Sequence, residues 1–301
     1  MGRLTAIVLG SAAGGGFPQW NCRCPVCRLA WEGDARVRPR TQASLAVSAD
    51  GDAWVLLNAS PDLSQKIRQC MKLHPRSGTR GSPITAVVLT GTEVDQIAGL
   101  LALRERQSFS LVATASSLAT LAENPIFGVL ASEAVTRHAV IPGQQFDLPG
   151  GLAGELFLVP GKVPLYLESD NPDTSAETGA NAGIELSAGS TRIAYIPGAA
   201  AITPRMLDYI RRADVVFFDG TLFRDDEMLA TGTGEKSGRR MGHVPIDAPD
   251  GPLAVLNGVR ARRILVHINN TNPILIDGSP ERARVEASGW EVAEDGMEIV
   301  L

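Results

Sequence analysis

Three cysteines lie within one short stretch near the start of the chain, at Cys22, Cys24 and Cys27. Thiolates are soft ligands that suit zinc, and a structural zinc ion takes four such ligands or a mixture of cysteine and histidine. Thiols this close together do not pair efficiently as disulfides, which need particular Cα separations. The spacing therefore predicts a structural zinc site whose fourth ligand comes from elsewhere. The alternative is a set of buried or incidental thiols.

Two other candidate metal ligands follow runs of apolar residues. Asp219 comes directly after four apolar residues, and His267 comes after the apolar run 264–266. Ligand sites in α/β sheets gather at the carboxyl ends of strands, so distant segments can assemble one metal centre there. His243 lies on a glycine-containing loop and could reach the same cleft. The alternatives are a core histidine at 267 and a turn-forming aspartate at 219.

A further acidic pair, Glu93 and Asp95, lies where the apolar run 84–89 meets a predicted helix. Both side chains point the same way if this segment is extended. Acidic residues at a helix start also cap the helix and stabilise its dipole, which is the alternative role. Lys162, on a Pro-Gly-Lys loop, is a candidate contact for an anion or a solvated side chain.

The elements that must position these residues are short apolar strands alternating with helices. A hairpin is predicted around Asp50-Gly51, between strands at 44–48 and 53–57. Two similar halves, about 1–150 and 151–301, predict a single domain of two mixed sheets facing each other with helices outside. The other predicted strands are 4–9, 84–89, 108–114, 156–159, 183–186, 192–196, 215–218 and 264–266, and the predicted helices are 63–73, 97–106, most of 115–133, 203–212 and 250–258.

Composition excludes several classes of protein. The 301 residues carry a net charge of −5, with no clustered basic surface of the kind that binds nucleic acid. No apolar run approaches the ~20 residues of a membrane helix, and the first apolar stretch is too short for a signal peptide. We therefore expect a cytoplasmic protein. Only four histidines are present, so a two-metal centre built from five or six imidazoles is impossible.

Several motifs together resemble the pyrroloquinoline quinone (PQQ) biosynthesis protein B family of the metallo-β-lactamase superfamily. They are LGSAAGGGFPQWNCRC (9–24), LNASPD (57–62), DDEM (225–228), RMGH (240–243) and VHINNTNP (266–273). The resemblance extends over almost the full length. It implies an αββα sandwich, in agreement with the pattern of strands and helices.

The resemblance also places residues 91–96 on the superfamily motif His-x-His-x-Asp-His. Every motif histidine is replaced here, and Asp95 alone remains; Asp219 and His267 match two further metal positions. Within the family the position of Gln96 is usually histidine, and an amide oxygen is the poorer ligand. Asp95, Asp219 and His267 are therefore the expected active-site ligands, with His243 as a further ligand or as an acid–base group. Glu93, Gln96 and Lys162 are expected around them.

Related phosphodiesterases of the superfamily close the cysteine site with a histidine three residues beyond the strand-end histidine. Asn270 occupies that position here. Asn270 is therefore the expected fourth zinc ligand, and His243 is the alternative.

The activity implied by the resemblance is an iron(II)-dependent hydroxylation of a tyrosine-containing peptide or amino acid on the route to PQQ, with Lys162 and Arg104 contacting the substrate. An iron held by two histidines and one carboxylate leaves positions open for oxygen and substrate. A second hypothesis is a soluble carrier that helps to transport PQQ or its precursor to the periplasm. Other PQQ biosynthesis proteins are candidate partners, and a homodimer stays open.

Overall fold

Uninterrupted apolar segments form the central strands of the molecule because both faces of these strands are covered. The computed structural model describes residues 4–301 and contains two seven-stranded sheets. In β11 (Val215–Asp219), Val215 and Phe217 belong to the core between the sheets, whereas Val216 and Phe218 belong to the core under the helices. This alternation follows from the two-residue period of a strand.

The first sheet has the order β14-β1-β2-β3-β4-β5-β6. Strands β3 to β6 pair in parallel, so their carboxyl ends lie at the same edge. The members of this sheet are β1 (Thr5–Gly10), β2 (Ser44–Ser48), β3 (Trp54–Leu57), β4 (Ile84–Val88), β5 (Phe109–Thr114), β6 (Val135–Val140) and β14 (Glu298–Val300).

The second sheet has the order β13-β12-β11-β10-β9-β8-β7. Strands β10 to β13 are parallel, and their carboxyl ends likewise meet at one edge. Besides β11, its members are β7 (Gln145–Leu148), β8 (Leu152–Leu158), β9 (Ala182–Ala188), β10 (Thr191–Ile196), β12 (Arg262–Val266) and β13 (Trp290–Val292).

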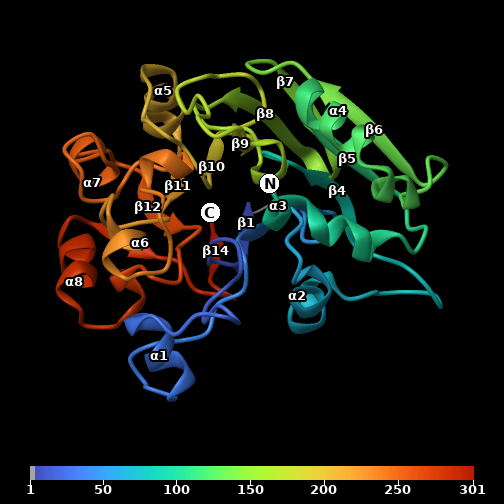
Figure 1. Cartoon of the computed structure of the whole chain (residues 1–301). Coiled ribbons are helices and arrows are strands. Elements are labelled where there is room, and N and C mark those ends of the chain that lie inside the picture. The colour runs from blue at the N-terminus through green and yellow to red at the C-terminus, as the bar shows by residue number, and fades with distance from the viewer. Residues whose placement is uncertain (1–3) are drawn as a thin grey trace.

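Helices cover the outer sides of both sheets (Figure 1). Within the described residues, none of these helices has the length and apolar character needed to cross a bilayer. The α-helices are α1 (Pro25–Trp31), α2 (Leu63–Gln69), α3 (Val94–Ile97), α4 (Ala115–Glu123), α5 (Pro204–Arg212), α6 (Glu227–Ala230), α7 (Pro252–Val255) and α8 (Pro280–Ala287). The 3-10 turns are η1 (Met71–Leu73), η2 (Ala98–Leu103), η3 (Pro125–Val129), η4 (Pro149–Gly151), η5 (Leu165–Leu167), η6 (Arg239–Met241) and η7 (Pro273–Leu275).

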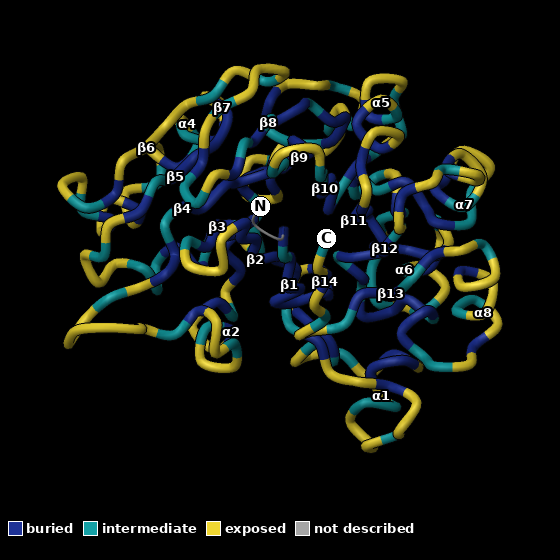
Figure 2. The backbone as a smooth tube through the Cα atoms, turned by 180° about the vertical axis from the view of Figure 1, so that it is seen from behind, coloured by how far each residue is buried: buried dark blue, intermediate teal, exposed yellow. Residues whose placement is uncertain are grey.

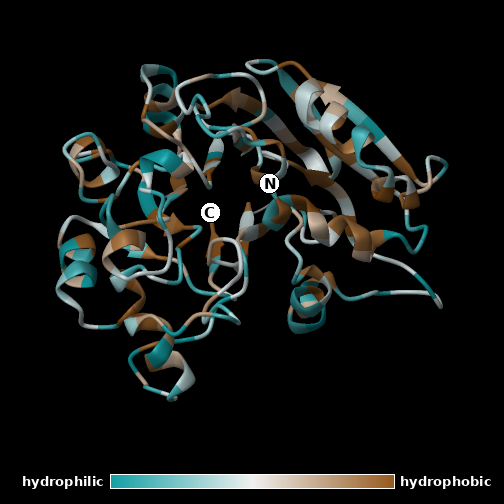
Figure 3. Cartoon of the chain, in the orientation of Figure 1, coloured by the Kyte–Doolittle hydropathy of each residue, from teal (hydrophilic) through white to brown (hydrophobic). Residues whose placement is uncertain are grey.

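Three hydrophobic clusters hold these layers together. One lies between the two sheets, and the other two lie between each sheet and its helices. Most strands are accordingly buried, while helix surfaces, loops and the edge strand β6 are exposed (Figure 2), and apolar residues concentrate on the buried strands (Figure 3). This layering confirms the predicted αββα sandwich.

Several predicted boundaries were wrong. The helix predicted at 97–106 begins earlier, at Val94, and continues as the 3-10 turn η2. The helix predicted at 63–73 breaks at Cys70, which has an extended backbone between α2 and η1. The helix predicted at 250–258 shortens to α7. The strands β6, β7, β13 and β14 and the helices α1, α6 and α8 were not predicted.

Candidate metal centres and cavity

The parallel pairing of β11 with β12 brings the first two candidate ligands together. Asp219 is paired with Val266, and His267 is the next residue along the chain. His267 has a φ of 57°, a left-handed conformation that is uncommon for residues other than glycine. Such conformations gather at functional sites. The imidazole lines a cavity at the carboxyl edge of the second sheet.

His243 reaches the same place from the loop that follows η6. Its Nδ1 lies 2.7 Å from Oδ2 of Asp219, and its ring stacks on that of His267 with the centroids 5.3 Å apart. One donor atom from each of Asp219, His243 and His267 lies within 4.8 Å of the other two. The structure therefore groups one carboxylate and two imidazoles.

Thr221 connects all three of these residues, a role that no sequence motif indicates. Its hydroxyl lies 2.6 Å from Oδ1 of Asp219, 2.8 Å from Nδ1 of His267 and 3.1 Å from Nδ1 of His243. Asp219 is fully buried, and the backbone N–H groups of Ala199 and Thr221 also donate to it. Burial alone would raise the pKa of Asp219, but the charge and hydrogen bond of His243 lower it below its ordinary value.

Asp95 lies on α3, which follows a strand of the first sheet. It is not part of the group formed by Asp219, His243 and His267. Its Oδ2 is 3.0 Å from Nε2 of His267. Burial opposes both charges, yet this hydrogen bond and the attraction of opposite charges lower the pKa of Asp95 and raise the pKa of His267. Asp95 thus contacts the candidate ligand His267, and its own role as an active-site ligand stays a prediction.

Glu93 and Gln96 form a capping box at the start of α3. The backbone N–H of Glu93 donates to Oε1 of Gln96 at 3.1 Å, and the Glu93 side chain accepts from the backbone of Gln96. A Cβ added at Gly91 would lie 2.4 Å from Oε1 of Gln96, so glycine makes room for this amide. Glu93 also binds Lys162, with 2.9 Å between Oε1 and Nζ.

The same cavity, of about 400 Å³, is lined by Glu93, Asp95, Gln96 and Lys162. Arg104 does not line it; the Arg104 guanidinium is exposed and donates to the carbonyl of Leu101. Residues of this cavity that the sequence did not single out include Glu168, Asn181, Lys236 and Asn269. His74 and His138 lie outside the lining of this cavity, at a partly exposed and an exposed position.

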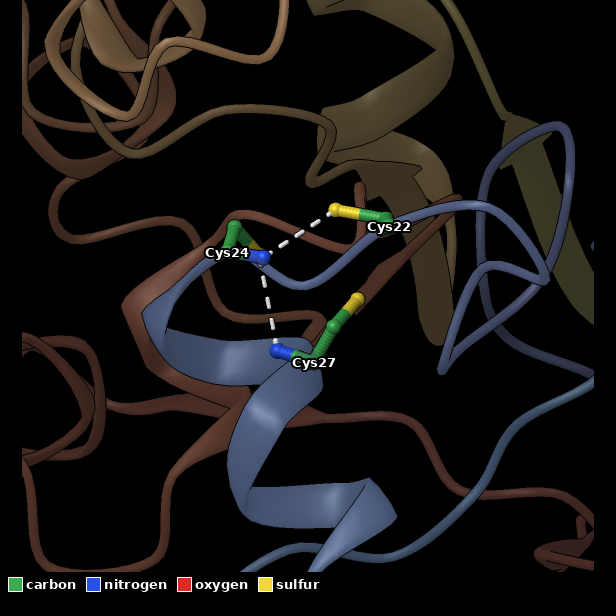
Figure 4. Close-up of side chains that lie close together, drawn as sticks. All are labelled: Cys22, Cys24 and Cys27. Carbon is green, nitrogen blue, oxygen red and sulfur yellow. Dashed lines mark hydrogen bonds between the residues drawn. The ribbon is translucent and has the colours of Figure 1, made fainter.

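The three cysteines converge at the start of α1 (Figure 4). The Cys24 side chain caps the helix by accepting from the N–H of Cys27, and the N–H of Cys24 donates to Cys22 at 3.4 Å. A hydrogen bond from the Cys24 thiol lowers the pKa of Cys27, and the same hydrogen bond, together with burial, raises the pKa of Cys24. All three thiols are free within the described residues.

Asn270 lies against these thiols, whereas His243 pairs with Asp219. The amide nitrogen of Asn270 is 3.1 Å from the sulfur of Cys22 and 3.3 Å from that of Cys27. Rotating the amide would exchange its nitrogen and oxygen, so an oxygen ligand can occupy this position. The structure thus brings Asn270, and not His243, to the cysteine site.

Comparison with known proteins places this geometry in a family. The model of the beta-lactamase superfamily domain matches residues 53–268. Coenzyme PQQ synthesis protein B of Methylorubrum extorquens is 53% identical over 98% of this chain and 99% of its own length. The chain belongs to the coenzyme PQQ synthesis protein B family. The family member of Rhizobium meliloti is 51% identical, covering 99% of this chain and 98% of its own length.

A solved PqqB structure agrees with this membership. The Zn²⁺-bound PqqB from Methylobacterium extorquens superposes with a TM-score of 0.97 at 51% identity, covering 99% of this chain and 100% of its own. The two proteins therefore share the same fold over nearly their full lengths.

Proposed function

We propose that this chain acts in PQQ biosynthesis by hydroxylating a tyrosine-derived ring of a precursor, with iron(II) bound by Asp219, His243 and His267. The observation that carries the proposal is the group of one carboxylate and two imidazoles within 4.8 Å. Two histidines and one carboxylate are the ligand set of non-haem iron(II) oxygenases. The remaining histidines, His74 and His138, lie outside the cavity, which argues against a histidine-rich two-zinc hydrolase.

The donors fit an iron ion because other residues already hold them in place. The Thr221 hydroxyl contacts Nδ1 of His267 at 2.8 Å, and this leaves Nε2, on the side of Asp95, as the nitrogen that would bind an ion. Partners of this kind orient ligand imidazoles and carboxylates around metals. When bound, iron(II) supplies the activation of dioxygen.

The other polar residues would bind and position the precursor. Lys162 and Glu93 form an ion pair on the cavity wall, and Glu93 also caps the first turn of α3. His243 lines the cavity and can also hold a proton beside the substrate. Overall, one atom of dioxygen enters the ring in place of hydrogen, and the other leaves as water with two electrons and two protons from a small-molecule reductant.

The experiment supplies anaerobically iron-loaded protein with glutamyl-tyrosine, ascorbate and then oxygen. We expect oxygen uptake and a catechol product detected by mass spectrometry, with loss of both in His267→Ala. A well-metallated sample that takes up no oxygen contradicts the proposal. Tight binding of PQQ or its precursor in that same sample would instead support the soluble carrier.

We also propose a structural zinc ion at Cys22, Cys24 and Cys27, with Asn270 as the fourth ligand. Three thiols that converge within 4.8 Å, beside an amide at 3.1 Å, have the chemistry of such a site. The Zn²⁺-bound state of the related PqqB structure supports zinc as the metal.

A further inference from the structure

A buried carboxylate gathers three cations at the wall of the cavity. Glu168 has a side chain only 4% exposed, and its Oε1 accepts from Lys236 at 2.8 Å and from Nη1 of Arg240. Its Oε2 lies 3.1 Å from Nζ of Lys162. Burial alone would raise the pKa of Glu168, but hydrogen bonds from Lys236, Arg240 and Lys162 lower it to about 2. Glu168 is therefore ionised and holds the three cations together.

The cluster retains unused positive charge. Three cationic side chains face two carboxylates, Glu168 and Glu93, so one positive charge is in excess. Lys162 is already occupied, because its ammonium contacts both carboxylates and the carbonyl of Val163. An ammonium has three N–H donors, and Lys236 has Glu168 as its partner among the described residues. The Lys236 side chain is 41% exposed and lines the cavity, so it can donate to a ligand.

The proposed iron ligands line another part of the same cavity. Asp219 is buried there, and Asp95 is partly buried beside His267. A carboxylate on a ligand is attracted to the Lys236 ammonium. Leu165 and Met241 line the space as apolar contacts for a ring. A ligand with one carboxylate at Lys236 would therefore direct its remaining part toward Asp219 and the two histidines.

We propose that Lys236, held in place by Glu168, is the contact for a substrate carboxylate and selects anionic aromatic substrates for the cavity. This inference rests on the proposed function for its orientation of the ring. The excess of a single positive charge matches one carboxylate better than a dianionic phosphate group.

Calorimetric titration of the metal-loaded protein tests this subsite without oxygen or turnover. The probes are glutamyl-tyrosine and glutaminyl-tyrosine amide, which lacks both carboxylates. We expect the dicarboxylate to bind about ten-fold more tightly than the amide, because a charge-assisted hydrogen bond contributes about 1.5 kcal/mol or more. Lys236→Gln should remove most of this preference, and Lys236→Arg should restore it.

Lys72→Gln is the matched control, since Lys72 is a half-exposed lysine paired with Glu298 away from the cavity. Equal affinity for the two peptides, no binding of either, or equal behaviour of Lys236→Gln and Lys72→Gln would overturn the subsite. Selective binding without hydroxylation would leave the subsite in place and reject the oxygenase. Hydroxylation without a preference for the dicarboxylate would reject the subsite and leave the oxygenase in place.

Discussion

At the scale of single residues, the candidate iron site depends on hydrogen bonds that fix the orientation of its carboxylate and its two imidazoles. Thr221 has one hydroxyl proton, and its closest partner is the buried carboxylate of Asp219. If that proton is donated to Asp219, Nδ1 of His267, 2.8 Å away, must be the donor in its contact with the hydroxyl oxygen. Nδ1 of His243 lies 3.1 Å from the hydroxyl and 2.7 Å from Oδ2 of Asp219, which is its nearer acceptor. Thr221 is therefore a positioning residue for the whole donor group.

Replacing this threonine tests that role. Thr221→Val keeps the shape but removes the hydroxyl, so both imidazoles and Asp219 lose a partner. We expect the affinity for iron(II) to fall about ten- to one hundred-fold, as is typical for residues that orient metal ligands. Competition with a chelator measures this affinity. Thr221→Ser is the control and should bind iron as the wild type does; equal affinity in the valine variant would contradict the role.

Glu227 gives a prediction for the pH dependence of stability. Burial raises the pKa of this carboxyl to about 7 from its ordinary 4.5, although Thr271 and the N–H of Phe223 donate to it. The folded chain holds the proton more tightly than the unfolded chain, so the free energy of unfolding decreases as the pH rises from about 4.5 to about 7. The shift corresponds to roughly 3 kcal/mol.

Glu227→Gln should remove this decrease. Urea unfolding at pH 5 and pH 7.5 measures it as the difference between variant and wild type. Glu235→Gln, at an exposed position, is the control and should follow the wild type. A glutamine variant with an unchanged pH profile would show that Glu227 does not carry a bound proton in the folded state.

At the scale of elements, the carboxyl ends of parallel strands supply most of the site, and this part was visible in the sequence. The apolar runs before Asp219 and His267 are long enough to identify buried strands. The bounds of α3 could not be predicted from the sequence. Its start depends on the capping box between Glu93 and Gln96, and it continues as a 3-10 turn. The edge strand β6 was missed because most of its residues are exposed and lack an apolar pattern.

Substitutions of Gln96 test whether a side chain at this position can reach the metal. Gln96→His would add an imidazole on the cavity wall, and we expect more iron bound per chain after loading. Gln96→Ala removes the same cap without adding a ligand and should show no gain. Elemental analysis of the loaded, desalted proteins measures the outcome. Equal iron in the histidine variant and the wild type would mean that residue 96 does not reach the metal.

The cysteine site should contribute directly to folding. In Cys24→Ser we expect loss of zinc and a lower melting temperature, because a structural site binds its metal only in the folded chain. Cys70→Ser is the matched control, since Cys70 lies at the end of α2 and apart from the other three thiols. Full zinc content in Cys24→Ser would contradict a structural site at these cysteines.

At the scale of the whole molecule, the cavity is assembled from segments that no local pattern connects. Lys236 meets Glu168 across 68 positions of sequence, and Asp95 meets His267 across 172. Strand periodicity predicted the two sheets, but the pairing of their loops depends on how the sheets face each other. The cysteines could be predicted because they are close in sequence, whereas the contacts of Thr221 and Glu168 required the folded chain.

We propose that the chain holds two different metal ions, one at the cysteines and one at Asp219, His243 and His267. Anomalous diffraction at the zinc and iron edges, from crystals loaded with iron(II) without oxygen, locates each ion separately. We expect a zinc peak among Cys22, Cys24 and Cys27 and an iron peak among the other three residues. An ion at the cysteines alone, with none beside the two histidines, would contradict it.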